Sequence, residues 1–168
     1  MMGDGMPKYL NSPETPVFDK SRNLYGMNLV MGKIKSMILC EGYMDVIALH
    51  QAGFSSAVAA LGTSFTPQHA VLIKRYTDMV YLCFDSDQAG IRAALRAIPI
   101  MKEAGISVRI ISMKPYKDPD DFIHSLGKEE FEKRMEQAMS SFFFEVSILE
   151  GQFNMSDPEE KTKFMNEV

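Results

Sequence analysis

Three acidic clusters, each following an apolar run of strand length, constrain the fold of this chain most strongly. An alternation of such runs with helical segments predicts an α/β fold with a mostly parallel sheet. Because parallel strands end at the same edge of a sheet, we expect the three clusters to meet in one cleft. The clusters span residues 41–45, 85–87 and 118–121, and the runs before them span 37–40, 79–84 and 108–111.

Start and stop signals place the other expected elements. Gly53 and Gly105 each end a helix, and Thr66 followed by Pro67 begins one. Pro99 falls inside a helical segment and predicts a kink or an early break there. We expect strands near 37–40, 57–60, 79–84 and 108–111, and helices near 44–52, 67–74, 88–104, 119–126, 128–139 and 142–149.

The chain divides into three parts. Residues 1–35 lack periodicity and carry several glycines and prolines, which predicts an extended, partly ordered arm. Residues 36–126 hold the α/β pattern, and residues 127–168 are predicted to be a helical extension. A strong helix start at 156–160 lies close to the last residue, Val168, and the opening has no cap or strand. We therefore expect a segment of a longer protein.

Composition favours a globular protein of the cytoplasm. Hydrophobic residues make up 46% of the chain and charged residues 24%. No apolar run approaches the roughly 20 residues of a membrane span, and the N-terminus does not resemble a secretion signal. Cys40 and Cys83 each end an expected strand, so we predict reduced, buried thiols. Zinc is not expected, because there is no Cys-x-x-Cys motif and the three histidines are scattered.

The charge is unevenly distributed. The net charge is −4, yet residues 1–35 hold five basic and three acidic groups, so the remaining residues carry −6. An enzyme that acts on nucleic acid needs basic surface for the phosphates. If this chain belongs to such an enzyme, we expect that surface to come mainly from elsewhere in the protein.

The acidic clusters have the chemistry of a divalent-metal site. Asp85 and Asp87 are two residues apart, so in an extended segment they project to the same side. Carboxylates held close together repel one another unless a cation bridges them, and oxygen ligands suit Mg²⁺ or Mn²⁺. A structural alternative exists for individual residues, since Asp45 lies in a first helical turn and Asp87 and Asp118 are placed as helix caps. The coincidence of three clusters favours the metal site, which could activate a 3′-hydroxyl and stabilise a leaving pyrophosphate.

Other features predict structure rather than chemistry. The aromatic run Phe142–Phe144 is expected to pack in the core rather than to stack on bases. No phosphate-binding glycine loop is present in the sequence.

Three motifs of the sequence resemble those of the TOPRIM fold, in the form found in bacterial DNA primases, and three further stretches also fit that family. The resemblance identifies 36–126 as a TOPRIM catalytic domain, 1–35 as an arm from a preceding primase lobe, and 127–168 as the start of a helical C-terminal subdomain. The three motifs are Glu41–Val46, Phe84–Gly90 and Lys117–Asp120; the turn Leu61–Thr63 also fits, and Pro7–Thr15 with Phe18–Lys20 is similar to the segment that precedes the domain in primases.

The resemblance implies a DNA-templated RNA polymerase that makes short RNA primers. Glu41, Asp85 and Asp87 would be the catalytic residues and core ligands of Mg²⁺ or Mn²⁺. Asp45, Asp118 and Asp120 would form an outer acidic set, plausible as a further metal site. The expected nucleotide or nucleic-acid contacts are Lys8 and Lys20.

The same resemblance implies partners. These are a single-stranded DNA template, ribonucleoside triphosphates and the RNA primer, with a replicative helicase bound through a region absent from this chain. Zinc would belong to a module that is also absent. We expect a monomer that does not bind membranes.

Two alternatives stay open. Another TOPRIM enzyme, a topoisomerase or a nuclease, would use the same metals to cleave phosphodiesters, and Tyr43 lies beside Glu41. A strand-cleaving tyrosine needs its own positioned site, however, and the primase-like arm speaks against this reading. The second alternative is a non-catalytic scaffold that binds metal or nucleic acid.

Overall fold

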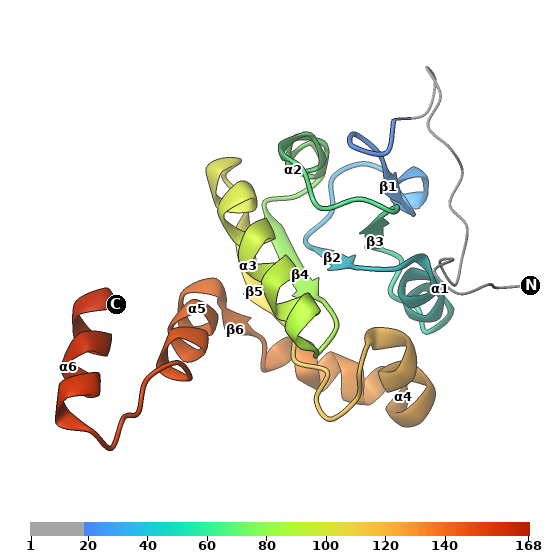
Figure 1. The fold of residues 1–168 in the computed structure, drawn as a ribbon. Coiled ribbons are helices and arrows are strands. Elements are labelled where there is room, and N and C mark those ends of the chain that lie inside the picture. Colours follow the sequence, from blue (N-terminus) through green and yellow to red (C-terminus); the bar gives the residue numbers. More distant parts are fainter. Residues whose placement is uncertain (1–18) are drawn as a thin grey trace, which may run out of the picture.

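A computed structural model describes residues 19–168, and a six-stranded sheet forms its centre (Figure 1). The strand order is β1-β3-β2-β4-β5-β6. The four inner strands, β2 (Met37–Cys40), β3 (Ala57–Ala60), β4 (Met79–Cys83) and β5 (Ser107–Ile110), run parallel to one another. The outer strands, β1 (Leu24–Tyr25) and β6 (Met139–Ser140), pair antiparallel with β3 and β5. The predicted mostly parallel α/β sheet is confirmed.

Helices cover both faces of the sheet, because alternate residues of each strand point to opposite sides. Met37 and Leu39 pack with residues of α2 (Pro67–Lys74) and α3 (Gln88–Glu103). Ile38 and Cys40 pack with residues of α1 (Tyr43–Gln51) and α4 (Pro119–Glu136). Strand β2 is therefore buried on both faces, as its unbroken apolar run indicates.

The helix start at α4 is anchored by aromatic packing. The Phe122 side chain is fully buried, and its ring lies 5.7 Å from that of Tyr116 and 6.0 Å from that of Phe131, both edge-on. This packing holds the first turn of α4, and the acidic residues in it, against the sheet edge.

Most predicted boundaries agree with the structure to within a residue or two, and two places differ. Helix α3 runs through Pro99 without a break, because Ala97, Ile98 and Met101 around it are buried against the sheet. The expected break near residue 127 is confirmed, since Gly127 has a non-helical φ of 82° inside α4. Residue 139 is not helical as expected but begins β6.

The second half of the expected arm belongs to the fold. Residues 24–25 form β1, a 3-10 helix follows at Met27–Leu29, and the side chains of Leu24, Met27 and Val30 are buried. Gly26 has a φ of 86°, and a Cβ there would lie 2.8 Å from the Ala57 carbonyl oxygen. Only glycine therefore fits this turn without strain. Residues 1–18 lie outside the part of the chain that the structure describes.

The helical extension is present as α5 (Ser141–Glu150) and α6 (Pro158–Glu167), and Figure 1 shows α6 standing well away from the sheet. The expectation that the aromatic run of α5 packs in the core is wrong for two of its residues. Phe142 and Phe143 are 56% and 64% exposed, whereas Phe144 packs against the main core. The helix presents only one face to the body, and three consecutive residues cannot share it.

The cysteines are buried free thiols, as predicted. Cys40 and Cys83 lie opposite each other on β2 and β4, and burial raises the pKa of both thiols. They are therefore unreactive core residues. Across residues 19–168, no helix has the length and apolarity needed to span a bilayer.

Candidate active site

The three acidic clusters meet at one edge of the sheet. Glu41 follows the last residue of β2, and Asp85 comes two residues after the end of β4. These strands are neighbours, with Cys40 opposite Cys83 at their ends. Asp118 begins α4, which follows β5, the next strand along the sheet. The predicted convergence of the clusters is therefore present in the fold.

Hydrogen bonds tie each cluster to the other two. The Glu41 Oε1 atom accepts from the Asp85 backbone N–H at 2.7 Å, across 44 residues of sequence. The Asp45 Oδ1 atom accepts from the Asp120 backbone N–H at 3.1 Å, across 75 residues. The Ser86 backbone N–H and hydroxyl donate to the carbonyls of Lys117 and Tyr116, at 2.8 and 2.9 Å. The acidic residues are thus held on a closed ring of contacts.

Two of these acids also cap helices, which is the structural alternative that the sequence left open. Asp87 is the N-cap of α3 and accepts from the Gly90 N–H at 2.8 Å. Asp118 is the N-cap of α4 and accepts from the Asp121 N–H at 2.8 Å. Asp120 contacts the ring of His124, 3.0 Å from its Nδ1. A cap uses one carboxylate oxygen and leaves the other available, so capping and ligation are compatible for Asp87 and Asp118.

Burial and repulsion from neighbouring carboxylates raise the pKa of Glu41, Asp45 and Asp85. Burial is the main cause for Asp45, whose pKa rises to about 7, with repulsion from Asp118, Asp85 and Asp120 adding to it. The pKa of Asp85 rises to about 6, again mainly through burial and then through Glu41, Asp118 and Asp87. Burial also raises the pKa of Glu41, although the Asp85 N–H opposes the shift. The cluster therefore concentrates negative charge at an energetic cost.

The donor chemistry of this cluster fits Mg²⁺ or Mn²⁺, because all of its side-chain donors are carboxylate oxygens. A divalent ion would offset the repulsion that raises the pKa of Asp45 and Asp85. Among the described residues, however, no three His, Cys, Asp or Glu side chains are grouped closely enough to hold an ion. Glu41, Asp85 and Asp87 therefore lie at one edge of the sheet without forming such a group.

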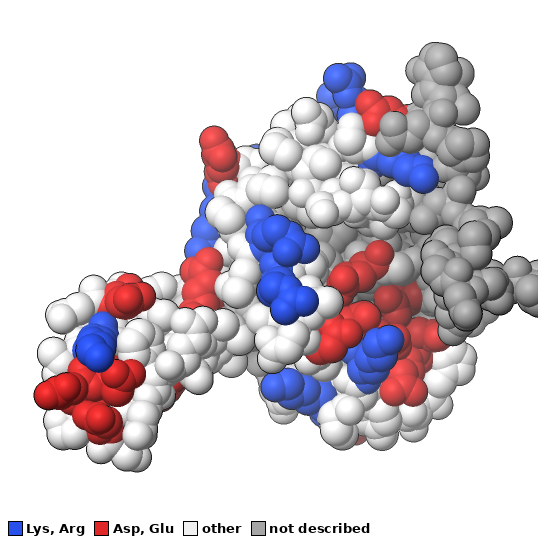
Figure 2. Space-filling view, in the orientation of Figure 1, with Lys and Arg blue, Asp and Glu red and all other residues white. Residues whose placement is uncertain are grey.

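Two cations that the sequence analysis gave no role lie near the cluster. Arg96 on α3 and Lys117 before α4 each oppose the rise in the pKa of Glu41, and Lys117 does the same for Asp85. Both side chains are exposed. Figure 2 shows acidic and basic side chains side by side on this face of the molecule. Such a mixed surface suits a substrate that brings both phosphates and their metal ion.

A cleft of about 450 Å³ opens beside Glu41. One wall is the loop after β3, Gly62 to Phe65, and the opposite wall is α3, including Arg96. Apolar side chains such as Leu39, together with the hydroxyl-bearing residues of the loop, complete the lining. The cleft thus offers an apolar floor, a guanidinium and a carboxylate within one space.

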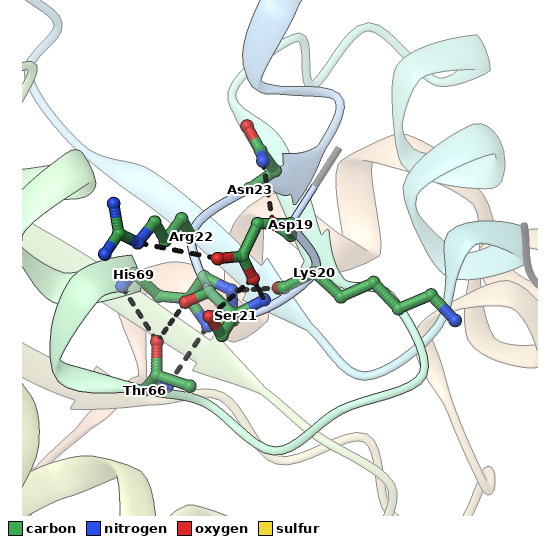
Figure 3. Close-up of polar contacts among 7 residues, drawn as sticks. All are labelled: Asp19, Lys20, Ser21, Arg22, Asn23, Thr66 and His69. Carbon is green, nitrogen blue, oxygen red and sulfur yellow. Dashed lines mark hydrogen bonds and ion pairs between the residues drawn. The ribbon is translucent and has the colours of Figure 1, made fainter. Parts of the chain in front are cut away.

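Lys20 lies at the same edge as the acidic cluster. Strand β1 runs antiparallel to β3, and its first residue, Leu24, is opposite Ala60, the last residue of β3. The residues before Leu24 therefore lie beyond the carboxyl end of β3, on the side where β2 leads into Glu41. Figure 3 shows the Lys20 side chain extended away from the polar contacts of its own backbone. Lys8 lies outside the described residues.

The sequence did not predict the residues that reach the site only because the fold brings them there. Arg96 is one of several helical arginines and lysines, and only the packing of α3 brings it beside Glu41. Lys117 stands directly before Asp118, and that adjacency was the one available signal. Thr66 was recognised as a helix cap, but its contact with the Ser21 carbonyl was not predictable from local pattern.

Comparison with known families gives two matches. The Toprim-like family matches residues 38–123, which includes the three acidic clusters. The N-terminal domain of the DNA primase catalytic core matches residues 1–31. Together the two matches cover the region that the sequence motifs singled out.

Curated relatives and solved structures agree with these families. DNA primases of Clostridium acetobutylicum and Escherichia coli are each 42% identical over 100% and 97% of this chain, which covers 28% and 29% of theirs. A solved DnaG catalytic core superposes with a TM-score of 0.83 at 40% identity, covering 99% of this chain and 56% of that one. A DnaG primase catalytic domain bound to single-stranded DNA gives a TM-score of 0.82 at 40% identity, covering 98% and 55%. The chain thus spans less than a third of the length of these curated relatives.

Proposed function

The chain belongs to the bacterial DNA primase family, and on that basis we propose that it is the Toprim part of an enzyme that makes short RNA primers on a DNA template. The reaction would be nucleotidyl transfer, in which a 3′-hydroxyl attacks the α-phosphate of a ribonucleoside triphosphate and pyrophosphate leaves. The observation that carries the proposal is the ring of hydrogen bonds that holds three acidic clusters at one sheet edge.

The acidic residues divide by position. Glu41, Asp85 and Asp87 follow the central strands β2 and β4, and we assign them the core ligand set for Mg²⁺ or Mn²⁺. When bound, such an ion supplies electrostatic stabilisation for the phosphoryl group in transfer. Asp45, Asp118 and Asp120 form the outer set and could hold a further ion.

Within this chain the carboxylates do more than bind an ion. The Glu41 Oε1 atom orients the turn that carries Asp85 by accepting its N–H, while the second oxygen of Glu41 is free to face the substrate. Because burial raises the pKa of Glu41, the same carboxyl group is suited to accept a proton from the attacking hydroxyl. The Arg96 guanidinium and the Lys117 ammonium balance part of the charge.

Lys8 and Lys20 are proposed to contact phosphates of the nucleotide or the primer. Lys20 lies at the edge of the sheet that carries the acids, which supports this role. Residues 36–168 carry a net −6, so the grip on the template would come mainly from other parts of the protein. A relative of 40% identity has been solved with single-stranded DNA, which supports the same template here.

The remaining partners follow from the family. We propose ribonucleoside triphosphates and the RNA primer as substrate and product, and a replicative helicase bound through a part of the protein that this chain does not include. We further propose that the protein acts in the cytoplasm as a monomer.

The test uses a full-length protein that contains this chain. Incubation with single-stranded template, labelled ribonucleotides and Mg²⁺ or Mn²⁺ should give short labelled RNA that depends on the template. A parallel incubation with supercoiled plasmid should give no nicking or relaxation. Cleavage without synthesis would instead favour a topoisomerase or nuclease. The absence of both reactions would favour a non-catalytic scaffold.

A further inference from the structure

His69 is the most completely buried histidine among the described residues, and both of its ring nitrogens have partners. It lies in the first turn of α2, with 0% of its surface exposed. Its Nδ1 lies 3.1 Å from the Thr66 backbone nitrogen, and its Nε2 lies 2.8 Å from the Lys20 carbonyl oxygen. Figure 3 shows the ring placed between the start of α2 and the segment that carries Lys20.

The donors and acceptors in these contacts define the protonation state and the tautomer of the ring. A backbone N–H can only donate, so Nδ1 must accept from Thr66 and cannot carry a proton. The neutral ring then has its proton on Nε2, which donates to the Lys20 carbonyl. Burial lowers the pKa of His69, in agreement with a neutral ring. The Asp19 carboxylate, which lies on the segment that the ring holds, opposes this lowering of the pKa.

A second bond parallel to the first holds the same segment. The Thr66 hydroxyl accepts from the His69 backbone N–H at 3.1 Å and donates to the Ser21 carbonyl at 2.5 Å. The segment is also rigid within itself, because Asp19 Oδ1 accepts from the N–H and the hydroxyl of Ser21, at 2.9 and 2.6 Å. Two neighbouring carbonyls are thus clamped to the start of a helix 45 and 49 residues away.

The bonds from Thr66 to the Ser21 carbonyl and from His69 to the Lys20 carbonyl, together called the clamp, connect Lys20 to the cleft beside Glu41. Thr66 follows directly on the loop from Gly62 to Phe65 that forms one wall of that cleft. The Phe65 ring lies 5.6 Å from the His69 ring, so the wall and the clamp pack together. The backbone of Lys20 is therefore fixed relative to the wall that faces Arg96 and Glu41, while its side chain extends away from the clamp.

We propose that His69, together with Thr66, is a positioning residue for Lys20, so that the affinity of the site for the phosphates of a ribonucleoside triphosphate depends on the bond from His69 Nε2 to the Lys20 carbonyl. This inference rests on the proposed function and on the role assigned to Lys20 there. His69 does not touch substrate, since it is buried. It acts by limiting where the Lys20 ammonium can reach.

Two substitutions of His69 separate its two bonds. His69→Asn places an amide oxygen near the position of Nδ1, which can keep the bond from Thr66, but it has no donor that reaches Lys20. His69→Gln extends an amide nitrogen toward the position of Nε2 and can restore that donor. In primer synthesis by the full-length protein, we expect His69→Asn to raise the KM for ribonucleoside triphosphate roughly tenfold with kcat little changed. His69→Gln should recover most of the loss.

The matched control is His50→Asn. The His50 Nε2 also bonds a backbone carbonyl, that of Ala57 at 2.9 Å, but at the start of β3 and away from Lys20. This variant should leave the KM unchanged. Hydrogen exchange gives a readout that is independent of activity: the amides of residues 20–23 should exchange faster in His69→Asn and not in His50→Asn.

Combining His69→Asn with Lys20→Ala completes the test. If His69 acts through Lys20, the double variant should have the same KM as Lys20→Ala alone. The inference is overturned if the effects of the two substitutions multiply, if His69→Asn lowers kcat and melting temperature without raising the KM, or if residues 20–23 keep their protection. A wild-type protein that makes no primers would overturn the proposed function instead, whereas primer synthesis that is insensitive to Lys20→Ala would overturn the role of Lys20 and this inference with it.

Discussion

The Glu41 carboxylate accepts a hydrogen bond from the backbone N–H of Asp85, with 2.7 Å between Oε1 and the nitrogen. This bond joins the ends of the two central strands and places two carboxyl groups on neighbouring turns. It also means that Glu41 has a structural contact that a neutral isostere can keep. The chemistry of this residue can therefore be tested without removing the contact.

Glu41→Gln is expected to abolish primer synthesis while the fold is retained. The glutamine Oε1 atom still accepts from Asp85, but the side chain is no longer an anionic ligand or a base. In the full-length protein, incorporation of labelled ribonucleotide should fall by about 100-fold or more. The melting temperature of the variant serves as the control and should stay close to that of the wild type. Unimpaired synthesis would show that the acidic cluster is structural and would favour the scaffold alternative.

Asp85→Asn combined with Asp87→Asn should weaken the binding of Mn²⁺ and raise stability in metal-free buffer. The substitutions remove like charges from a site where burial and neighbouring acids raise the pKa of Asp85 to about 6. Asparagine is also a good N-cap, so the cap of α3 should persist. We expect a gain in the free energy of unfolding of about 1 kcal/mol in the presence of a chelator. Calorimetric titration with Mn²⁺ and melting curves in chelator measure the two effects.

The control for this double variant is Asp157→Asn. Asp157 caps α6 by accepting from the Glu159 N–H at 2.9 Å, away from the acidic cluster. This substitution should change neither the affinity for Mn²⁺ nor the stability in chelator by a comparable amount. Equal Mn²⁺ affinity of the double variant and the wild type would count against the metal site.

Stability in chelator should fall as the pH rises from about 4 to about 7. The pKa of Asp45 is about 7 in the folded protein and about 3.9 in an unfolded chain. Between these values the folded state binds more protons, so linkage makes the free energy of unfolding decrease with rising pH. Asp45→Asn should reduce this decrease by about 1–2 kcal/mol, since its amide oxygen can still accept from Asp120. Urea unfolding across this range, followed by circular dichroism, gives the slope.

His69 affects the pH dependence of the free energy of unfolding with the opposite sign to Asp45. Comparison of variants separates the two contributions. Burial lowers the pKa of His69, so the unfolded chain binds its proton more readily and stability falls as the pH drops below about 6.5. Both the wild type and Asp45→Asn carry His69, so this effect cancels in their difference. Asp78→Asn is the contrasting control: the bond from Lys74 lowers the pKa of Asp78, so this substitution should not reduce the decrease in stability over this range. A slope that is identical in Asp45→Asn and the wild type would contradict the prediction.

Gly90→Ala should destabilise the protein by about 2–3 kcal/mol and disturb the site. A Cβ at Gly90 would lie 2.0 Å from the Asp85 carbonyl oxygen, which is backbone and cannot rotate away. The first turn of α3 would have to move from the end of β4, and with it Asp87. Chemical denaturation measures the loss. Gly151→Ala is the matched control, because a Cβ there meets nothing closer than 3.5 Å and its φ of −64° suits alanine; an equal loss in both variants would refute the steric reason.

Patterns within short stretches predicted much of this structure. The apolar run of β2 and the Thr66–Pro67 start of α2 appear at the expected residues. The break at Gly127 is also where a flexible residue interrupts helical sequence. Such features depend on backbone geometry and on contacts within a few residues, so the local sequence is enough to predict them. The choice of a sheet edge for the acids followed from the same patterns together with the rule for parallel strands.

Packing decided where local rules compete. A proline predicts a break in a helix, yet α3 continues through Pro99 because buried neighbours hold it against the sheet. The run from Phe142 to Phe144 is apolar throughout, but α5 contacts the body on one side only, so two of its rings are exposed. At Pro99, tertiary contacts outweigh a local preference of about 3 kcal/mol; at Phe142 and Phe143, the body offers no surface on which their apolar area could be buried.

The amino-acid sequence alone thus determined the order of strands and helices, the α/β class and the acidic residues that gather at one edge. Tertiary structure alone decided how those residues are held. The bonds from Asp120 to Asp45 and from His69 to Lys20 join groups 75 and 49 residues apart, and no local pattern encodes such a pair. Hydrogen bonds form only at contact distance, and for groups so remote along the chain that distance exists only after the sheet and its helices have packed.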